Sequence, residues 1–132
     1  MRRTLLTVCT LLIAAHVSAC ASSSTGSSRP RSERNLITAA DVQRANATNA
    51  LEAVERLRPQ FLRQHGTPTI QQPQGAPVVV YLNEQQLGGV GTLRNILAGE
   101  IREIRYIDAR DATTRWGTGH AGGVILVSTV GR

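Results

Sequence analysis

The sequence contains no lysine, and it is poor in cysteine and in aromatic residues. All 15 basic residues are arginine, there are two cysteines, and aromatic side chains make up 3% of the 132 residues. Two cysteines exclude a small scaffold held together by several disulfides. Nucleic-acid-binding surfaces gather basic residues into patches and stack aromatic rings on bases, whereas the arginines here are scattered. We therefore expect no nucleic-acid partner.

The sequence also lacks an apolar run long enough to span a bilayer, which takes about 20 residues. Residues 5–15 form an uncharged, mostly apolar run that follows Arg2 and Arg3 and stops before His16. A positive start followed by an apolar run of roughly 7–15 residues is typical of a secretory signal peptide. Residues 1–19 are therefore predicted to be a signal peptide.

A cysteine follows two small residues at the end of this segment. The sequence Val17-Ser18-Ala19-Cys20 resembles the lipobox of bacterial lipoproteins. The resemblance implies that Cys20 becomes the first residue of the mature chain and carries fatty acyl chains such as palmitate. Each buried CH₂ contributes roughly 0.8 kcal/mol, so two or three chains hold a protein stably at a membrane. A plain secretory signal with incidental cysteines is the alternative.

By resemblance to lipoprotein sorting rules, Ala21 after the cysteine favours the outer membrane. Cys9 would leave with the signal and Cys20 would be acylated, so we expect neither a disulfide nor a cysteine-based metal site in the mature chain. Removal of the signal leaves 13 arginines against nine acidic residues, a net charge of about +4. This charge indicates a mildly basic, solvated surface; binding to acidic lipid headgroups or to polyanions is the alternative.

The mature chain is predicted to have two parts. Residues 20–35 are rich in serine and read as a flexible tether. Residues 36–132 have room for one domain only. A helical turn is predicted from Thr38, with Asp41 three residues later, and a longer helix from Asn49 to the residues before Pro59.

The remaining pattern favours strands. We predict a short strand at residues 36–37 and three longer strands at residues 78–82, 101–108 and 124–129. Residues 83–91 read as a polar, glycine-rich connection, residues 92–97 as a short helix, and residues 109–116 as a polar, helix-capable turn. Phe61 and Leu62 are expected in the core. The predicted fold class is α+β, a small domain with one mixed sheet of three or four strands and two or three short helices.

These elements resemble the plug domain of TonB-dependent outer-membrane receptors. Residues 49–59 resemble the early plug helix, residues 79–83 its "V-x-(I/L)-D-G" strand, and residues 101–107 its "I-E-x-I-E-V-L" strand. The most specific match is Ala-Thr-Thr-Arg-Trp-Gly at residues 112–117, followed by Ala-Gly-Gly-Val-Ile at residues 121–125. Asn83-Glu84 departs from the family's "D-G" turn, and Trp116 replaces its usual tyrosine. We expect no receptor barrel after residue 129, so the resemblance implies the fold and not transport.

Several short motifs have a simpler interpretation than chemistry. Residues 117–122 spell G-x-G-x-x-G, but they precede a predicted strand instead of opening a helix, so a glycine turn is favoured over a dinucleotide site. Residues 88–92 are likewise interpreted as a turn. Asp108, Asp111 and His120 are weak metal-ligand candidates, and Asp108 is expected to cap the following turn. No Ser-His-Asp set is apparent. We expect no cofactor, no metal and no enzymatic activity.

Two residues are candidates for contact with a partner. Trp116 lies beside the glycine-rich turn and next to Arg115, and these residue types are enriched in binding hot spots. The predicted function is an outer-membrane-anchored lipoprotein whose plug-like domain is an interaction module, facing the periplasm and binding an outer-membrane barrel or another envelope protein. A small-ligand or glycan-binding module that uses the glycine-rich loops is the alternative.

Overall fold

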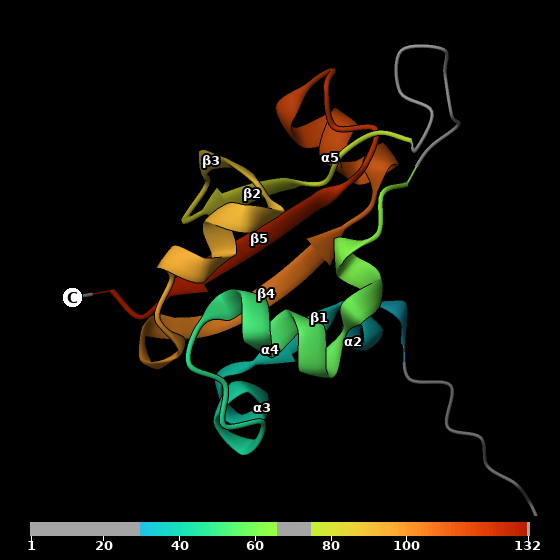
Figure 1. Ribbon diagram of the computed structural model, residues 1–132. Helices are drawn as coiled ribbons and strands as arrows, with labels where there is room; N and C mark the ends of the chain where they lie inside the picture. The colour runs from blue at the N-terminus through green and yellow to red at the C-terminus, as the bar shows by residue number, and fades with distance from the viewer. Residues whose placement is uncertain (1–29, 66–74, 132) are drawn as a thin grey trace, which may run out of the picture.

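The domain is built on a single mixed sheet. The computed structural model describes residues 30–65 and 75–131, and its strands are β1 (Leu36–Thr38), β2 (Val79–Leu82), β3 (Gln85–Gly89), β4 (Ile101–Ile107) and β5 (Val124–Thr129). Their order across the sheet is β1-β4-β5-β2-β3. Strands β2 and β5 run parallel, and the other neighbours are antiparallel (Figure 1). The α+β fold with one mixed sheet is confirmed, with five strands instead of three or four.

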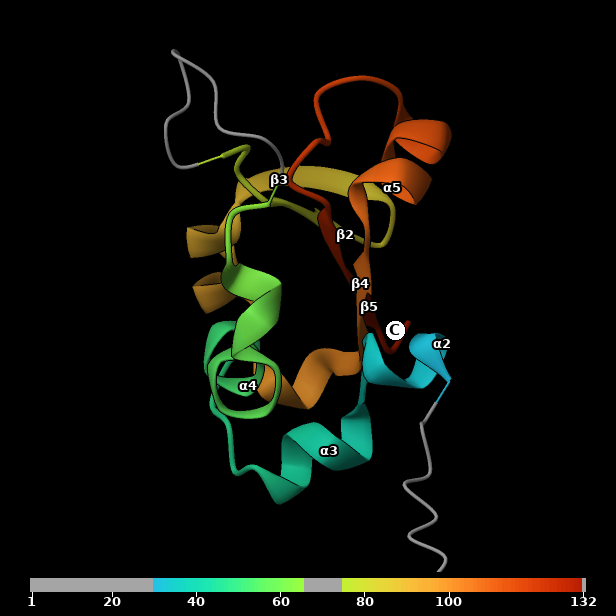
Figure 2. The same cartoon turned by 90° about the vertical axis from the view of Figure 1, so that its right-hand side faces the viewer.

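Short helices cover both faces of this sheet. They are α2 (Arg31–Arg34), α3 (Ala39–Arg44), α4 (Ala50–Leu57) and α5 (Ala109–Trp116), with 3₁₀ turns η1 (Pro59–Leu62), η2 (Val90–Asn95) and η3 (Ala98–Glu100). Seen along the sheet, α4 lies on one side and α5 on the other (Figure 2). Within the described residues, no helix has the length and apolar character needed to cross a membrane.

The predicted caps start the helices. Thr38 accepts a hydrogen bond from the Asp41 amide at 3.3 Å, and Asp41 accepts one from the Thr38 amide at 3.0 Å, which completes a capping box. The Asn49 side chain accepts from the Glu52 amide at 3.0 Å. Glu52, however, accepts from the Thr48 amide at 2.7 Å and not from Asn49, so the box predicted for α4 closes one residue earlier.

The main core lies between the sheet and α3, α4, η1 and η2. Alternate residues of the strands point into it, as the sequence pattern predicted for β4. Ile104 is fully buried and Tyr106 packs beside it, while Ile107 points to the opposite face. Phe61 is 2% exposed, which confirms its predicted core position, and Leu62 is half-buried. Full burial of one such aliphatic or aromatic side chain contributes roughly 1.5–3 kcal/mol.

A smaller cluster lies on the opposite face, under α5. Tyr81, Ala112, Val124 and Leu126 are buried there, with Trp116 packed against them. Residues 109–116 therefore form a full helix that covers the sheet, where the sequence indicated only a helix-capable turn. Ala112 is the one fully buried residue of α5, and most of its other residues are polar. The sequence therefore has no apolar helical periodicity that would predict a helix packed on the sheet.

Strand β3 and helix α2 were not predicted from the sequence. The β2–β3 hairpin turns at Asn83 and Glu84, whose φ angles are +47° and +72°. Two positive φ angles define the two-residue turn that best joins twisted antiparallel strands. Asparagine and glycine favour these angles, whereas glutamate does not. Asn83-Glu84 therefore lacks the residue pattern from which a hairpin turn is predicted. Helix α2 forms within residues 20–35, which were interpreted as tether.

Two consecutive glycines bring the chain into β5. A Cβ at Gly122 would collide with the backbone carbonyl of Pro77. Gly123 has φ +83°, and a Cβ there would collide with the Tyr106 hydroxyl. The Gly-Gly pair is thus required by a close backbone approach and by a left-handed conformation.

Replacing Gly123 with alanine is expected to lower the free energy of unfolding by about 2–4 kcal/mol, because left-handed strain and overpacking add. Gly99→Ala is the matched control, since a Cβ there meets nothing within 4 Å and its φ is not positive. Urea unfolding of both variants measures the difference. Equal losses at the two positions would contradict this account of the turn.

Candidate functional site

The turn at residues 117–123, between α5 and β5, joins two tyrosine–histidine pairs. Tyr81 and His120 lie on the α5 side of the sheet, and Tyr106 and His65 lie at the edge of the main core. The turn contacts both pairs through its backbone: the Gly117 carbonyl bonds to His120, and the Gly122 carbonyl accepts from Tyr106. This end of the sheet holds the densest set of polar aromatic contacts in the described residues.

The first pair is buried and fully hydrogen-bonded. His120 is 6% exposed, its Nε2 lies 2.9 Å from the Tyr81 hydroxyl, and its Nδ1 lies 3.0 Å from the Gly117 carbonyl. A carbonyl oxygen only accepts, so Nδ1 carries a proton and donates it to Gly117, while Nε2 and the Tyr81 hydroxyl form the second hydrogen bond. Both imidazole nitrogens are therefore used to hold the turn against β2.

The predicted contact residues lie over this pair. The Trp116 ring stacks on Tyr81 with centroids 4.6 Å apart, and the Arg115 guanidinium lies 4.7 Å from the centre of the Trp116 ring. Arg115 also forms an ion pair with Glu84 at 2.5 Å. Trp116 is half-buried and helps to cover Tyr81, while Arg115 is exposed. Their contact with a partner stays a prediction, and the structure adds a packing role for the tryptophan.

The second pair is more open. The Tyr106 hydroxyl donates to the Gly122 carbonyl at 3.2 Å and lies 3.3 Å from His65 Nδ1. The Tyr106 ring stacks on Phe61 with centroids 5.2 Å apart. Burial, and after it the negative charge of Asp108, raises the pKa of the Tyr106 phenol above its ordinary value of 10.0. The phenol therefore stays protonated and a hydrogen-bond donor at neutral pH.

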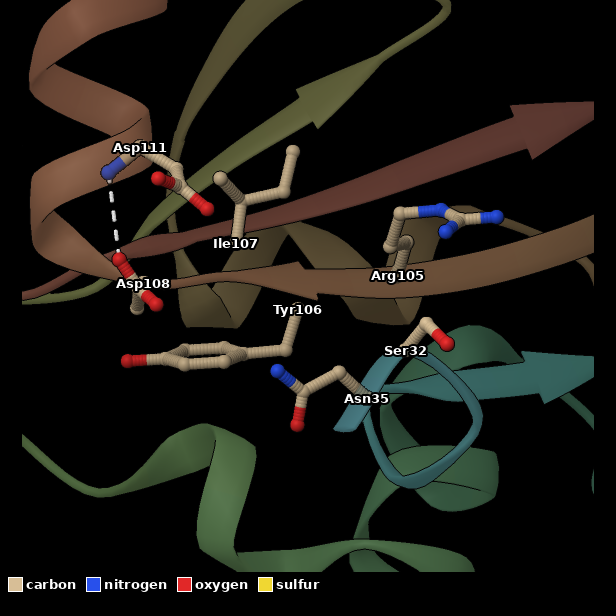
Figure 3. Close-up of a pocket in the computed structure, with 7 residues that line it drawn as sticks. All are labelled: Ser32, Asn35, Arg105, Tyr106, Ile107, Asp108 and Asp111. Carbon is tan, nitrogen blue, oxygen red and sulfur yellow. Dashed lines mark hydrogen bonds between the residues drawn. The ribbon is translucent and has the colours of Figure 1, made fainter. Parts of the chain in front are cut away.

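Two adjoining hollows open beside Tyr106, and both are lined by Asn35, Tyr106 and Asp108. The larger has a volume of about 410 Å³, and the smaller has a volume of about 270 Å³. In the smaller hollow, Asp108 and Asp111 lie at one end and Arg105 at the other (Figure 3). The larger hollow is within the 300–1,000 Å³ range of small-ligand pockets. Sequence reasoning missed both hollows, because their walls come from four separate elements.

The proposed metal candidates do not come together. Asp108 caps α5, as predicted, by accepting from the amides of Arg110 and Asp111 at 3.2 Å each. Asp111 shares the smaller hollow with Asp108, whereas His120 is held by Tyr81 on the other face of the sheet. Over residues 30–65 and 75–131, no three His, Cys, Asp or Glu side chains are grouped to hold a metal ion.

The glycine motifs have structural roles in the described residues. The G-x-G-x-x-G string precedes β5 and opens no helix, in agreement with its interpretation as a turn. Gly88 and Gly89 end β3, and a 3₁₀ helix follows them, in which Leu93 is buried. Cys20, the predicted lipidation site, lies outside the described residues.

Comparison with known proteins adds no assignment. No protein-family model matches the chain, and no curated protein matches it.

The raised Tyr106 pKa gives a pH prediction. Because the folded-state pKa lies above the unfolded value, the neutral phenol contributes stability that is present below about pH 10 and lost as pH rises through the folded pKa. In a Tyr81→Phe background, absorbance titration should place the Tyr106 midpoint above 10.0. Asp108→Asn should lower that midpoint, since asparagine keeps the helix cap but removes the charge. A midpoint at 10.0 in both proteins would refute the assignment.

Proposed function

We propose that this chain is an outer-membrane-anchored lipoprotein whose plug-like domain is a non-enzymatic interaction module of the cell envelope. The observation that carries the proposal is the form of residues 112–125, which hold the most specific resemblance to TonB-receptor plugs. They form, in order, the end of α5, a glycine turn and the buried strand β5. The motif residues thus have coherent roles in a small α+β domain, which is the fold class that the resemblance implies.

A binding role agrees with the chemistry at the end of the sheet. Both nitrogens of His120 are engaged in hydrogen bonds that hold the turn. The Tyr106 phenol stays protonated at neutral pH because its pKa is raised. Both His120 nitrogens are already hydrogen-bonded, and a phenol that stays protonated is a poor base, so these two groups are suited to hold the turn and not to abstract a proton.

The surface of α5 suits a protein partner. Arg115 and Trp116 are adjacent, and tryptophan and arginine are the residue types most enriched in binding hot spots. The ion pair between Arg115 and Glu84 is half-exposed, so it contributes little and is exchangeable for a carboxylate of a partner. An envelope protein, such as an outer-membrane barrel, is the proposed partner.

A small-ligand or glycan-binding module is the second candidate function. The two hollows beside Tyr106 favour it, because aromatic walls and planar polar side chains converge there. Saturable binding of a neutral sugar, with no protein partner, would favour this candidate over the first.

Anchoring is tested by Cys20→Ser in the full-length protein. The variant should move from the membrane fraction to the soluble fraction, because the acyl chains supply the hydrophobic attachment. Fractionation with carbonate-washed membranes measures the change, and Ser22→Ala serves as a control that leaves the lipobox intact. A Cys20→Ser protein that stayed fully membrane-bound would contradict the proposed anchor.

The interaction role is tested by photo-crosslinking in intact cells. A photoreactive residue at position 115 should give an adduct of defined mass with an envelope protein. The matched control places the same residue at position 94, in η2, which packs with α4 on the other face of the sheet. Recovery of the bait alone, or the same adducts from both positions, would refute a partner surface at α5.

A further inference from the structure

Three short helices end close together, and each ends at an arginine. Arg34 is the last residue of α2, Arg44 is the last residue of α3, and Arg58 is the C-cap of α4. Cations are favoured beside the unpaired carbonyl groups at helix C-termini. Arg34 is exposed, 75% of the Arg44 side chain is accessible to solvent, and Arg58 is half-buried. The three helix ends thus present arginine side chains at the surface.

Contacts between the helix ends bring these arginines together. Arg58 Nε donates to the Arg34 carbonyl at 3.1 Å. Arg44 and Arg58 line one hollow of about 200 Å³ together with Asp41, whose carboxylate pairs with Arg44. Hydrogen bonds from Thr38, and after them the charges of Arg44 and Arg58, hold the pKa of Asp41 below its ordinary value of 3.8. We call Arg34, Arg44 and Arg58 the basic face.

The excess positive charge of the described domain lies in the same part of the chain. Residues 30–65 contain six arginines and four acidic residues, whereas residues 75–131 contain five of each. Glu33 in α2 and Asp41 in α3 are the acids of these two helices, so the arginines of the basic face outnumber them, and Arg31 adds a further charge to α2. The positive balance therefore remains at the helix ends.

The proposed lipid anchor places this face near a membrane. Residues 20–29 separate the anchor from Pro30, where the described chain begins, and a fully extended chain of that length spans at most about 36 Å. Pro30 leads directly into α2, whose last residue belongs to the basic face. Anionic phospholipid surfaces attract arginines that come within a Debye length, about 8 Å at physiological ionic strength. The chain thus enters the domain beside the side chains that such a surface attracts.

We propose that the basic face docks on the anionic phospholipid surface in which the acyl chains of Cys20 are embedded. This inference rests on the proposed lipid anchor and adds an orientation to it. A guanidinium has five N–H donors, so the contacts of Arg44 and Arg58 within the protein leave further donors for phosphate oxygens.

The proposed orientation keeps α5 open to a protein partner. Helices α2, α3 and α4 lie in the lower half of both views of the molecule, and α5 lies at the top (Figure 1 and Figure 2). Docking through the basic face therefore directs α5, with Arg115 and Trp116, away from the membrane. The lipid surface and the protein partner would then occupy different ends of one domain.

The test uses the acylated protein, purified from membranes and placed in nanodiscs of equimolar phosphatidylglycerol and phosphatidylcholine. A lipid with a gadolinium chelate on its headgroup broadens the NMR signals of amides that lie close to the surface. We expect stronger broadening at Arg34, Arg44 and Arg58 than at Arg110 and Arg115 in α5. Nanodiscs of phosphatidylcholine alone, or salt at about 1 M, which shortens the Debye length to about 3 Å, should remove the difference.

Arg34→Gln combined with Arg44→Gln removes two charges from the basic face and leaves the capping box of α3 intact. Each arginine near an anionic surface favours binding by about fivefold, so the ratio of docked to undocked protein should fall by more than about tenfold. The matched control, Arg94→Gln combined with Arg110→Gln, removes the same charge from exposed positions in η2 and α5 and should leave the broadening unchanged.

Equal broadening at both ends of the domain, broadening that does not depend on phosphatidylglycerol, or equal effects of the two double variants would overturn the docking and leave the anchor standing. A protein that remains on neither kind of nanodisc would contradict the anchor, and the docking with it. In intact cells, a protein adduct from a photoreactive residue at position 44 would assign the basic face to a protein in place of lipid headgroups, and would also overturn the docking.

Discussion

The fold depends on the burial of β5 on both faces. Four consecutive residues of this strand, Val124 to Val127, are at most 6% exposed. Ile125 and Val127 pack into the main core, while Val124 and Leu126 pack under α5. A strand buried on both sides needs neighbours on both edges and a layer on each face, and β4, β2, α4 and α5 meet these requirements. The edge strands β1 and β3 then extend the sheet outward from β4 and β2.

The same constraint explains the glycine turn. To enter the sheet between β4 and β2, the chain passes so close to Pro77 and Tyr106 that no Cβ fits at Gly122 or Gly123. The two tyrosine hydroxyls then hold the turn from opposite faces, one through His120 and one through the Gly122 carbonyl. Structural and recognition roles thus overlap at this end of the sheet, because the residues that fix the turn also form the surfaces on which binding is proposed.

Local chemistry was enough to predict much of the fold. Thr38 and Asn49 were predicted as caps because their side chains accept from nearby amides, and β5 was predicted because its apolar run is uninterrupted. The β2–β3 hairpin was missed because Glu84 is a poor residue for its left-handed angle, and Gln85-Gln86 carry no apolar alternation. Glu84 pairs with Arg115, which lies 31 residues away, and no local pattern reports that contact.

The candidate site was harder to predict for the same reason. Arg115 and Trp116 were singled out by type and position, but the stacking of Trp116 on Tyr81 depends on the tertiary fold. The walls of the hollows beside Tyr106 come from α2, η1, β4 and α5. These elements are far apart in the sequence, so no local pattern indicates that their side chains line the same hollows. One signal was available: Tyr106 is the core-facing residue nearest the end of β4, where a hydroxyl needs a polar partner.

The position of β5 in the chain has a consequence for biosynthesis. Among the described residues it is the last strand of the sheet to be synthesised, yet it lies in the middle of the sheet and pairs with both β4 and β2. Residues 79–82 must wait for residues 124–127 before their parallel pairing forms, and such distant pairing is slow to form. The sheet therefore closes only after residues 124–127 have been synthesised. In the exported lipoprotein that we propose, this delay would keep the domain unfolded until β5 has left the translocation channel.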